Sequence, residues 1–229
     1  MAHSQLGGMS NAMSMRSAAA VGAFSTEAEA AAAARKMMFT HRSEEALSGG
    51  EFFTRVAYQV ARDGKSPREA IEAVAAGMSG WIQQQVRKGI AKFEEATDPS
   101  RPLSKEEFVD DLAMTSMARL WDVGKTEPIK VGKASPTEGT LPSSVYIILK
   151  YVDDFGAAVR ANAMVGGDNA SRAVVIGMVL GAWHGVDGIE PRLRDSLNAW
   201  AKCDALLDKL PALQQLRAKP VAGETKSEL

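Results

Sequence analysis

Apolar residues recur every three or four positions along most of the chain, which is the period of an amphipathic helix. The clearest example is the segment 44–63, whose apolar side chains fall on one helical face: Phe52, Phe53, Val56, Ala57 and Val60. Ser43 precedes this segment as an N-cap, and Gly64 follows it as a stop. The pattern therefore predicts a helix that starts at Ser43, ends near Asp63 and buries two phenylalanines.

Capping signals mark where other helices begin. The sequence Thr-Glu-Ala-Glu at 26–29 is typical of a capping box, and it precedes an alanine-rich helix predicted to end near Met38. Ser66 and Pro67 combine an N-cap with proline at the first helical position, and apolar positions extend that predicted helix through Ile82. The same reasoning predicts further helices over residues 104–121, 142–151, 153–164, 169–184 and 191–210.

The remaining segments show no helical period. Residues 98–102 form a predicted loop, and residues 123–140, rich in Gly, Pro, Lys and Thr, form the longest irregular segment. Segments of this kind are often functional loops or lids. A single domain over residues 1–215 is expected, followed by a polar tail at 216–229. No segment shows convincing strand alternation, so the predicted fold class is all-α.

Composition narrows the classes of function. The 229 residues are 45% hydrophobic and 24% charged, which is ordinary for a soluble globular domain. The formal net charge of −1 gives no field that favours nucleic acid or an anionic membrane, so neither is an expected partner. No apolar run approaches the ~20 residues of a transmembrane helix, and the N-terminus lacks a signal-peptide pattern. A soluble, cytoplasmic location is therefore the default expectation.

The supply of ligands limits metal chemistry. Cys203 is the only cysteine, which excludes an intramolecular disulfide and a cysteine-based zinc cluster. The histidines, His3, His41 and His184, are too few to favour a histidine-rich metal site. Oxygen ligands for Mg²⁺ or Mn²⁺ are the metal chemistry that the chain supplies well.

Residues 166–172, Gly-Gly-Asp-Asn-Ala-Ser-Arg, are the most informative stretch for function. The two glycines allow a tight turn, and Asp168 then stands where the N-cap of an apolar helix belongs. Because oxygen-bearing side chains lie beside exposed helix N–H groups, the stretch is consistent with a structural cap, a cation site or a phosphate site. In the helix that follows, glycine recurs every fourth residue, which predicts close packing against a neighbour: Gly177, Gly181 and Gly185.

The segment from Gly166 to Gly185 resembles the C-terminal signature of the ADP-ribosylglycohydrolase family, whose fold some lens crystallins share. Three earlier segments are similar to family motifs in the same order. They are a loop ending in Met-Arg, a Thr-His after a helix and a Pro-containing helix start, at residues 10–19, 39–41 and 141–146. The resemblance covers roughly residues 5 to 190. It implies a compact bundle of helices with an active site in a central cleft.

The resemblance also implies a metal site. In the family, the Gly-Gly-Asp loop supplies two aspartates and a threonine to a pair of divalent cations. Asp168 matches the first aspartate and Ser171 the threonine, which assigns Mg²⁺ or Mn²⁺ to these two residues. Ala170 stands at the second aspartate and cannot bind metal, and Asn169 offers only a neutral oxygen. Arg172 adds positive charge nearby, which disfavours a cation and favours a phosphate.

Substrate-binding residues follow from the same resemblance. The family's glycine-rich loop passes under the phosphates and ribose of the substrate, which assigns Gly8, Ser10 and Asn11 to ADP-ribose binding. The family's histidine lies along the bound ADP-ribose, which assigns His41. The alternatives are a flexible chain terminus for the loop and a partner for the helix dipole in the case of His41.

One family motif has no counterpart. Family members carry an earlier part with a Thr-Asp-Asp motif that supplies the other metal ligands, and these 229 residues contain no Thr-Asp-Asp. The chain therefore resembles the C-terminal two-thirds of a member, and we expect its hydrolysis of ADP-ribosyl bonds to be impaired. The alternatives are a catalytically inactive ADP-ribose-binding or crystallin-like structural protein and a helical interaction module. The expected partners are ADP-ribose or an ADP-ribosylated protein, and exposed helix faces predict self-association.

Overall fold

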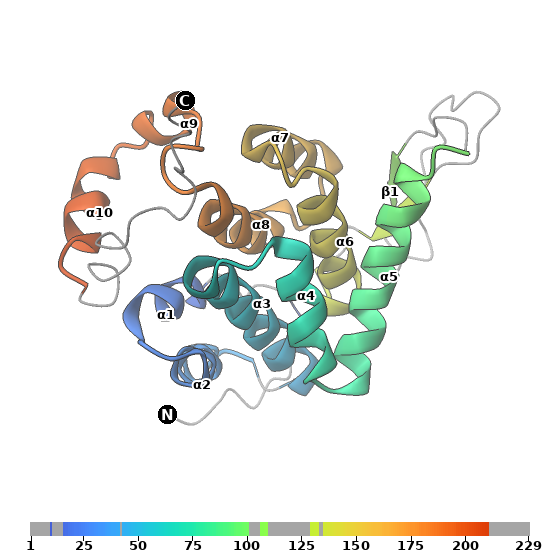
Figure 1. The fold of residues 1–229 in the computed structure, drawn as a ribbon, viewed down its shortest axis with the longest axis horizontal. Helices are drawn as coiled ribbons and strands as arrows, with labels where there is room; N and C mark the ends of the chain where they lie inside the picture. The colour runs from blue at the N-terminus through green and yellow to red at the C-terminus, as the bar shows by residue number, and fades with distance from the viewer. Residues whose placement is uncertain are drawn as a thin grey trace, which may run out of the picture.

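The computed structural model describes residues 10, 16–41, 43–100, 106–109, 129–132 and 135–210. Within these ranges the chain is mostly helical, so the predicted all-α class is confirmed (Figure 1). The helices are α1 (Ala18–Ala23), α2 (Glu27–Met37), α3 (Glu44–Asp63), α4 (Pro67–Ala76), α5 (Gly80–Thr97), α6 (Thr137–Lys150), α7 (Phe155–Val165), α8 (Asn169–His184), α9 (Pro191–Asp195) and α10 (Trp200–Leu207). None of these helices has the length and apolarity that crossing a membrane requires. The predicted tail at 216–229 lies outside the described residues.

One hydrophobic core is shared by the inward faces of α3, α4, α5, α6, α7 and α8, with α3 in the middle of the bundle (Figure 1). Phe52 and Phe53 of α3 are fully buried in it, and their rings meet edge to face with centroids 5.0 Å apart. At about 25 cal/mol per Å², burying such a side chain contributes roughly 2 kcal/mol. α1 and α2 cover one side of α3 through a second, smaller apolar cluster.

Local signals in the sequence account for α3. Ser43 accepts a hydrogen bond from the amide of Ala46 at 3.4 Å, and Gly64 ends the helix in the left-handed conformation with φ of 69°. The apolar face predicted for this helix is buried as a whole. The predicted bounds and buried face of α3 are therefore confirmed.

The helix predicted from Ser66 through Ile82 is in fact two helices. Its capping box is present, since the Ser66 hydroxyl accepts from the amide of Glu69 and the Glu69 carboxylate accepts from the amide of Ser66. α4 ends before Gly77, and Ser79 caps α5 by accepting from the amide of Ile82 at 3.4 Å. A glycine followed closely by a capping serine stops one helix and starts another, a signal that the continuous apolar spacing obscured.

Two short strands, β1 (Glu106–Val109) and β2 (Ile129–Gly132), pair in parallel although the sequence predicted no strand. The helix predicted over 104–121 is wrong at 106–109, and the rest of that range lies outside the described residues. β2 falls inside 123–140, the segment predicted to be irregular. Aromatic and β-branched residues favour these strands, but the pairing is non-local, so capping signals could not reveal it.

α6 begins at Thr137, and Pro142, which was expected at the helix start, lies inside the helix. Pro142 has no N–H, so the helix lacks the bond that would reach the carbonyl of Glu138. Packing offsets this loss, because most of α6 is buried in the core. On the α5 side, a Cβ at Gly89 would lie 2.7 Å from the Pro142 carbonyl oxygen, so the two helices approach closely there.

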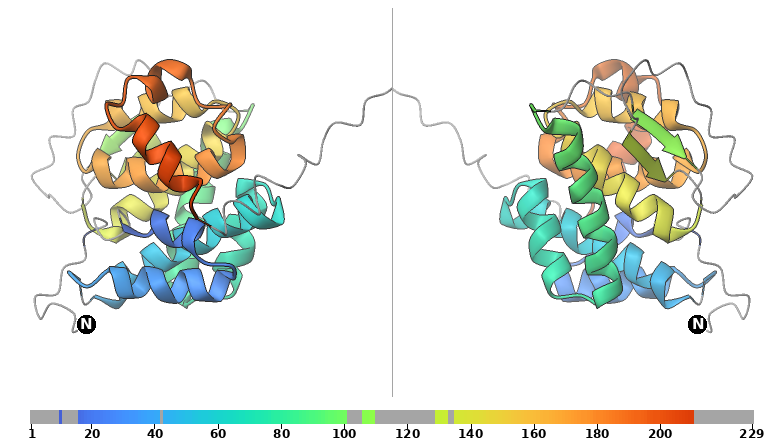
Figure 2. Two further views of the ribbon diagram at one scale, coloured as in Figure 1. Left: turned by 90° about the vertical axis from the view of Figure 1, so that its left-hand side faces the viewer. Right: turned by 90° about the vertical axis from the view of Figure 1, so that its right-hand side faces the viewer.

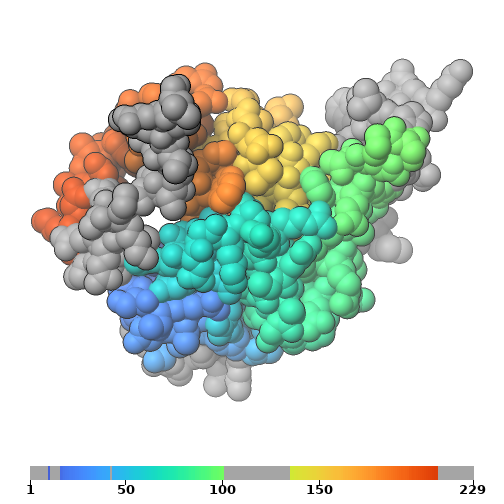
Figure 3. Space-filling model, viewed as in Figure 1, coloured from blue at the N-terminus to red at the C-terminus, as the bar shows by residue number. Residues whose placement is uncertain are grey.

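The helix predicted over 191–210 is interrupted between Asp195 and Trp200, which gives α9 and α10. Neither helix contributes a buried residue. α10 lies at the left-hand edge of Figure 1, faces the viewer on the left of Figure 2 and belongs to the same edge in the space-filling view (Figure 3). Serine and asparagine in the interruption are weak helix formers, and no core packing holds them in a helix.

Candidate functional site

The turn of Gly166, Gly167 and Asp168 begins α8 as the sequence predicts. Gly166 and Gly167 have φ of 71° and 59°, in the left-handed region that glycine adopts without strain. Asp168 then caps α8 by accepting a hydrogen bond from the amide of Ser171 at 3.4 Å. The predicted structural cap is present, while a cation or a phosphate at the turn stays a prediction.

Arg172 anchors this turn from inside the protein. Its side chain is fully buried, its Nε donates to Oδ1 of Asn162 at 3.0 Å, and its Nη2 donates to the carbonyl of Gly166 at 2.6 Å. Asn162, in α7, in turn donates to the carbonyl of Asn169 at 2.9 Å. Burial lowers the pKa of Arg172 to about 10, against the opposing effect of the Asp168 charge, so the guanidinium stays protonated at neutral pH.

The donor set at the turn does not fit a pair of divalent cations. Asp168 is its one carboxylate, Ala170 is exposed and has no ligand atom, and Ser171 is only 3% exposed. Within the described ranges, no three His, Cys, Asp or Glu side chains gather as a metal site requires. Divalent cations of this kind prefer several charged oxygens, and the nearby positive charge of Arg172 opposes them. Binding of Mg²⁺ or Mn²⁺ at Asp168 and Ser171 therefore stays a prediction.

Ser10 lies against the segment that precedes α6. Its Oγ is 2.9 Å from that of Ser135, and Ser10 forms an antiparallel bridge with Pro136. Gly8 and Asn11, the other loop residues assigned to ADP-ribose, lie outside the described residues. Of the three loop residues assigned to ADP-ribose, the structure therefore describes only Ser10, which lies next to the start of α6.

His41 lies in a small polar cluster between α2 and α3. Its Nδ1 is 2.9 Å from Oγ1 of Thr40, and Arg16 donates to the same hydroxyl at 3.0 Å. The Arg16 guanidinium also lies 5.1 Å from the ring centroid of Phe39. Burial, and then the positive charge of Arg16, lower the pKa of His41 from 6.5, so the ring is neutral at pH 7. A dipole role for His41, which relies on a protonated ring, is therefore weak at neutral pH.

Two of the four segments that resemble family motifs contact each other, and the first of them also contacts the residues that precede α6. Ser10 joins the first segment to the start of α6, and Arg16 joins the same segment to Thr40. α3 and α6 approach each other closely, since a Cβ added to Gly49 of α3 would lie 2.6 Å from Cγ2 of Thr137, the first residue of α6. The motif inside α6 is itself part of the core, so the polar groups available to a ligand come from the two loops.

Among the described residues, the glycine spacing of α8 brings no neighbour close. A Cβ at Gly177 or Gly185 would meet no atom of the described residues within 4 Å, and one at Gly181 would meet only Phe155 at 4.0 Å. The close packing predicted through these glycines is therefore wrong. The core-facing side of α8 is formed by branched apolar residues instead: Val175, Ile176, Val179 and Leu180. Branched side chains fill the core, while the glycines lie on the more exposed side of the helix.

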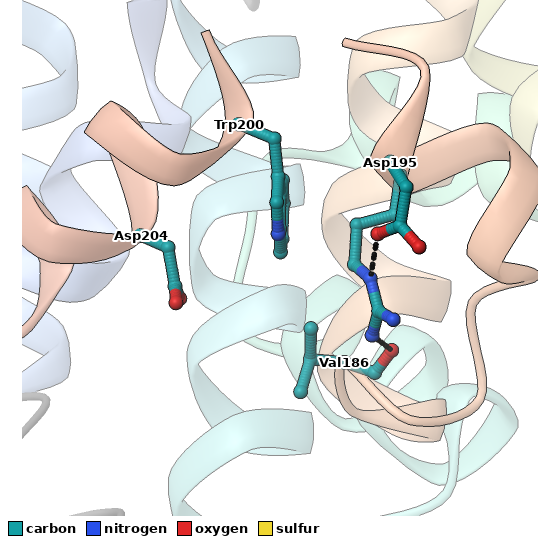
Figure 4. A pocket seen from close by; sticks show the side chains of 5 residues that line it. Val186, Asp195, Trp200 and Asp204 are labelled. Carbon is teal, nitrogen blue, oxygen red and sulfur yellow. Dashed lines mark hydrogen bonds and ion pairs between the residues drawn. The ribbon is translucent and has the colours of Figure 1, made fainter.

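A cavity of about 480 Å³ lies near the C-terminal end of α8, the end away from Asp168 (Figure 4). Its lining residues are Val186, Arg194, Asp195, Trp200 and Asp204. Arg194 donates to Asp195 at 2.9 Å, and its guanidinium lies 5.7 Å from the ring centroid of Trp200. Because α8 is 16 residues long, it spans about 24 Å between the Asp168 turn at its start and Val186 beyond its end, so the cavity does not belong to the same site.

Two residues that the sequence did not single out organise the candidate site. Asn162 is polar, lies in an otherwise largely apolar stretch of α7 and is 3% exposed. A buried polar side chain of this kind indicates a hydrogen-bond network. The signal available in the sequence was an amide side chain among mostly apolar neighbours. Arg16 lies in the Met-Arg segment, but its partner Thr40 is 24 positions away, and only the fold shows that contact.

Comparison with known proteins identifies the family and the fold. The sequence model of the ADP-ribosylglycohydrolase family matches residues 2–220. Among solved structures, the chain is similar to one described as an ADP-ribosylglycohydrolase-related protein complex, with a TM-score of 0.62 and 21% identity. That match covers 91% of this chain and 61% of the other, so the chain spans about three-fifths of that structure's length. No curated protein matches the sequence significantly. Because the family match extends over nearly the whole chain, this protein belongs to the ADP-ribosylglycohydrolase family.

Proposed function

We propose that this protein binds ADP-ribose, free or attached to a protein, and hydrolyses ADP-ribosyl glycosidic bonds weakly or not at all. One observation carries the proposal. The turn before α8 offers a single carboxylate, Asp168, next to the buried cation Arg172. Family membership supports recognition of ADP-ribose, and the composition of this turn supports impaired hydrolysis.

Hydrolysis of a glycosidic bond requires groups that this turn does not supply. Cleavage of a glycosidic bond passes through an oxocarbenium-like state and needs an activated, positioned water. Divalent ions held by several carboxylates supply that activation when they are bound. Here Asp168 already accepts a hydrogen bond from the amide of Ser171, and Ala170 has no ligand atom. The described residues therefore favour binding over catalysis.

ADP-ribose is proposed to lie across Ser10 and the cluster around His41. Arg16 is an exposed cation in that cluster, and guanidinium groups bind phosphates through charge-assisted hydrogen bonds. The neutral ring of His41 and the hydroxyl of Thr40 add polar atoms suited to ribose hydroxyls. Ser10 and Arg16 lie six positions apart in the chain, so the contacts of Ser10 with Ser135 and of Arg16 with Thr40 support one binding surface.

Calorimetric titration with ADP-ribose tests this surface. We expect Arg16→Ala and His41→Ala each to weaken binding about tenfold, which corresponds to roughly 1.4 kcal/mol. Lys202→Ala is the matched control, since Lys202 is an exposed cation on α10. Native protein that does not bind ADP-ribose, or equal affinity in all four proteins, would contradict the proposed surface.

A second candidate function is self-association. Large apolar side chains are exposed from the end of α8 through α10: Trp183, Val186, Leu197, Leu206 and Leu207. The charges among them have both signs, as the neighbours Arg194 and Asp195 illustrate. An apolar surface with mixed charges is suited to a second copy of the same chain.

A further inference from the structure

The turn before α8 is in contact with a buried cation, the guanidinium of Arg172. Arg172 is the fourth residue of α8, and side chains on a helix lean toward its N-terminus, so the guanidinium reaches back to the turn. Arg172 is fully buried, and it donates to the Gly166 carbonyl at 2.6 Å. A buried guanidinium thus contacts the backbone of the same turn that carries Asp168.

Asn162 extends these contacts into a network that ties α7 to α8. Its Oδ1 accepts from Nε of Arg172 at 3.0 Å, and its Nδ2 donates to the carbonyl of Asn169 at 2.9 Å. Asn162 is 3% exposed, so water competes little for these bonds. The network spans the turn from its first glycine to the first residue of α8.

Charge at the turn is also balanced internally. The Asp168 carboxylate and the Arg172 guanidinium interact electrostatically, and arginine stays protonated in proteins. The N-terminus of α8 adds a partial positive charge at the same place. A divalent ion placed on Asp168 and Ser171 would therefore meet positive charge from both the side chain and the helix.

We propose that the Arg172 guanidinium takes the structural place of a bound cation: it offsets the charge of Asp168 and holds the turn of residues 166–168 in shape. The turn is then ordered without a divalent ion, and Arg172 and Asn162 are positioning residues for it. This inference does not depend on ADP-ribose binding, since it concerns the order of the turn itself.

A Mn²⁺ titration of the whole chain, followed by electron paramagnetic resonance, tests the inference without disturbing the core. We expect native protein and Asp168→Asn to give superimposable binding curves, because the turn holds no divalent ion. Asparagine keeps the capping oxygen that accepts from Ser171, so this variant should fold. A saturable Mn²⁺ site in the native protein that Asp168→Asn removes would overturn the inference.

Amide hydrogen exchange in Arg172→Met tests the positioning role. Methionine keeps an unbranched apolar stem but cannot bridge Gly166 and Asn162. We expect exchange at the Ser171 amide to speed up at least tenfold. The Ala157 amide, which donates to the equivalent cap Asp154 at 2.8 Å, is the internal control and should be unchanged.

Unchanged protection of the Ser171 amide in Arg172→Met would overturn the positioning role. If that variant fails to fold, the Mn²⁺ comparison on native protein and Asp168→Asn still decides whether the turn is independent of metal.

Discussion

Arg16 donates a 3.0 Å hydrogen bond to the hydroxyl of Thr40, the residue directly before His41. The contact places a permanent positive charge beside an imidazole that is already partly desolvated. It also joins two segments that resemble family motifs but lie 24 positions apart. Burial is the larger cause of the lowered pKa of His41, and the charge of Arg16 adds to it.

Arg16→Ala should raise the pKa of His41 toward 6.5. Removing the guanidinium removes the Coulombic part of the depression, while the larger effect of burial remains. The measurement is an NMR titration of the His41 ring in the native and variant proteins. Arg87→Ala, which changes an exposed arginine on α5, should leave the pKa of His41 where it is.

The sign of the linked effect on stability follows from the same shift. Because the folded pKa of His41 lies below the unfolded value, the unfolded chain takes up the proton first as pH falls. The contribution of His41 to stability is therefore lost as pH falls below 6.5, and His41→Gln should reduce the pH dependence. Urea midpoints with the same pH dependence in both proteins would contradict this assignment.

Gly89→Ala should destabilise the protein by about 1–3 kcal/mol, the usual cost of overpacking. The added Cβ would lie 2.7 Å from the carbonyl oxygen of Pro142 and 2.8 Å from Cβ of Val145, so α5 and α6 would have to separate. Urea denaturation measures the change. Gly80→Ala is the control, since a Cβ there meets nothing within 4 Å; equal stability of the two variants would contradict the close approach.

Gly177→Ala should stabilise the protein by about 0.5–1 kcal/mol, because alanine is the better residue inside a helix. No described neighbour lies within 4 Å of the added methyl group. Thermal unfolding in the two proteins provides the comparison. A lower melting temperature in Gly177→Ala would instead mean that this face of α8 packs closely against something.

Self-association through α10 should weaken at least tenfold in Leu206→Lys. Leu206 is 51% exposed, and a charge in its place opposes burial of the surface from Trp183 to Leu207. Light scattering across a concentration series gives the mass. Met164→Lys, which changes an 86% exposed residue on α7, should associate as the native chain does. Native protein that stays monomeric throughout would remove this second candidate function.

Local signals predicted much of the fold. α8 has the bounds expected from its cap, and α3 has the expected cap, stop and buried face. The exceptions required non-local information. The pairing of β1 with β2 is set by a distant segment, and Pro142 is tolerated inside α6 because packing outweighs one missing hydrogen bond.

The candidate site was predictable only in part. Asp168 was found because an N-cap before an apolar helix is a local pattern. The burial of Arg172 was not found, because its partner Asn162 belongs to the preceding helix and a sequence does not show which side chains face each other. The glycines of α8 were misassigned for a similar reason: their spacing defines a face but not what lies opposite it.

Release of ADP-ribose from a mono-ADP-ribosylated protein, with and without Mg²⁺, tests the central claim most directly. The native chain and Asp168→Asn should both show little or no release, because one carboxylate beside Arg172 cannot hold the ions that the reaction needs. Robust Mg²⁺-dependent release by the native chain, abolished in Asp168→Asn, would contradict the account and restore this turn as a catalytic metal site.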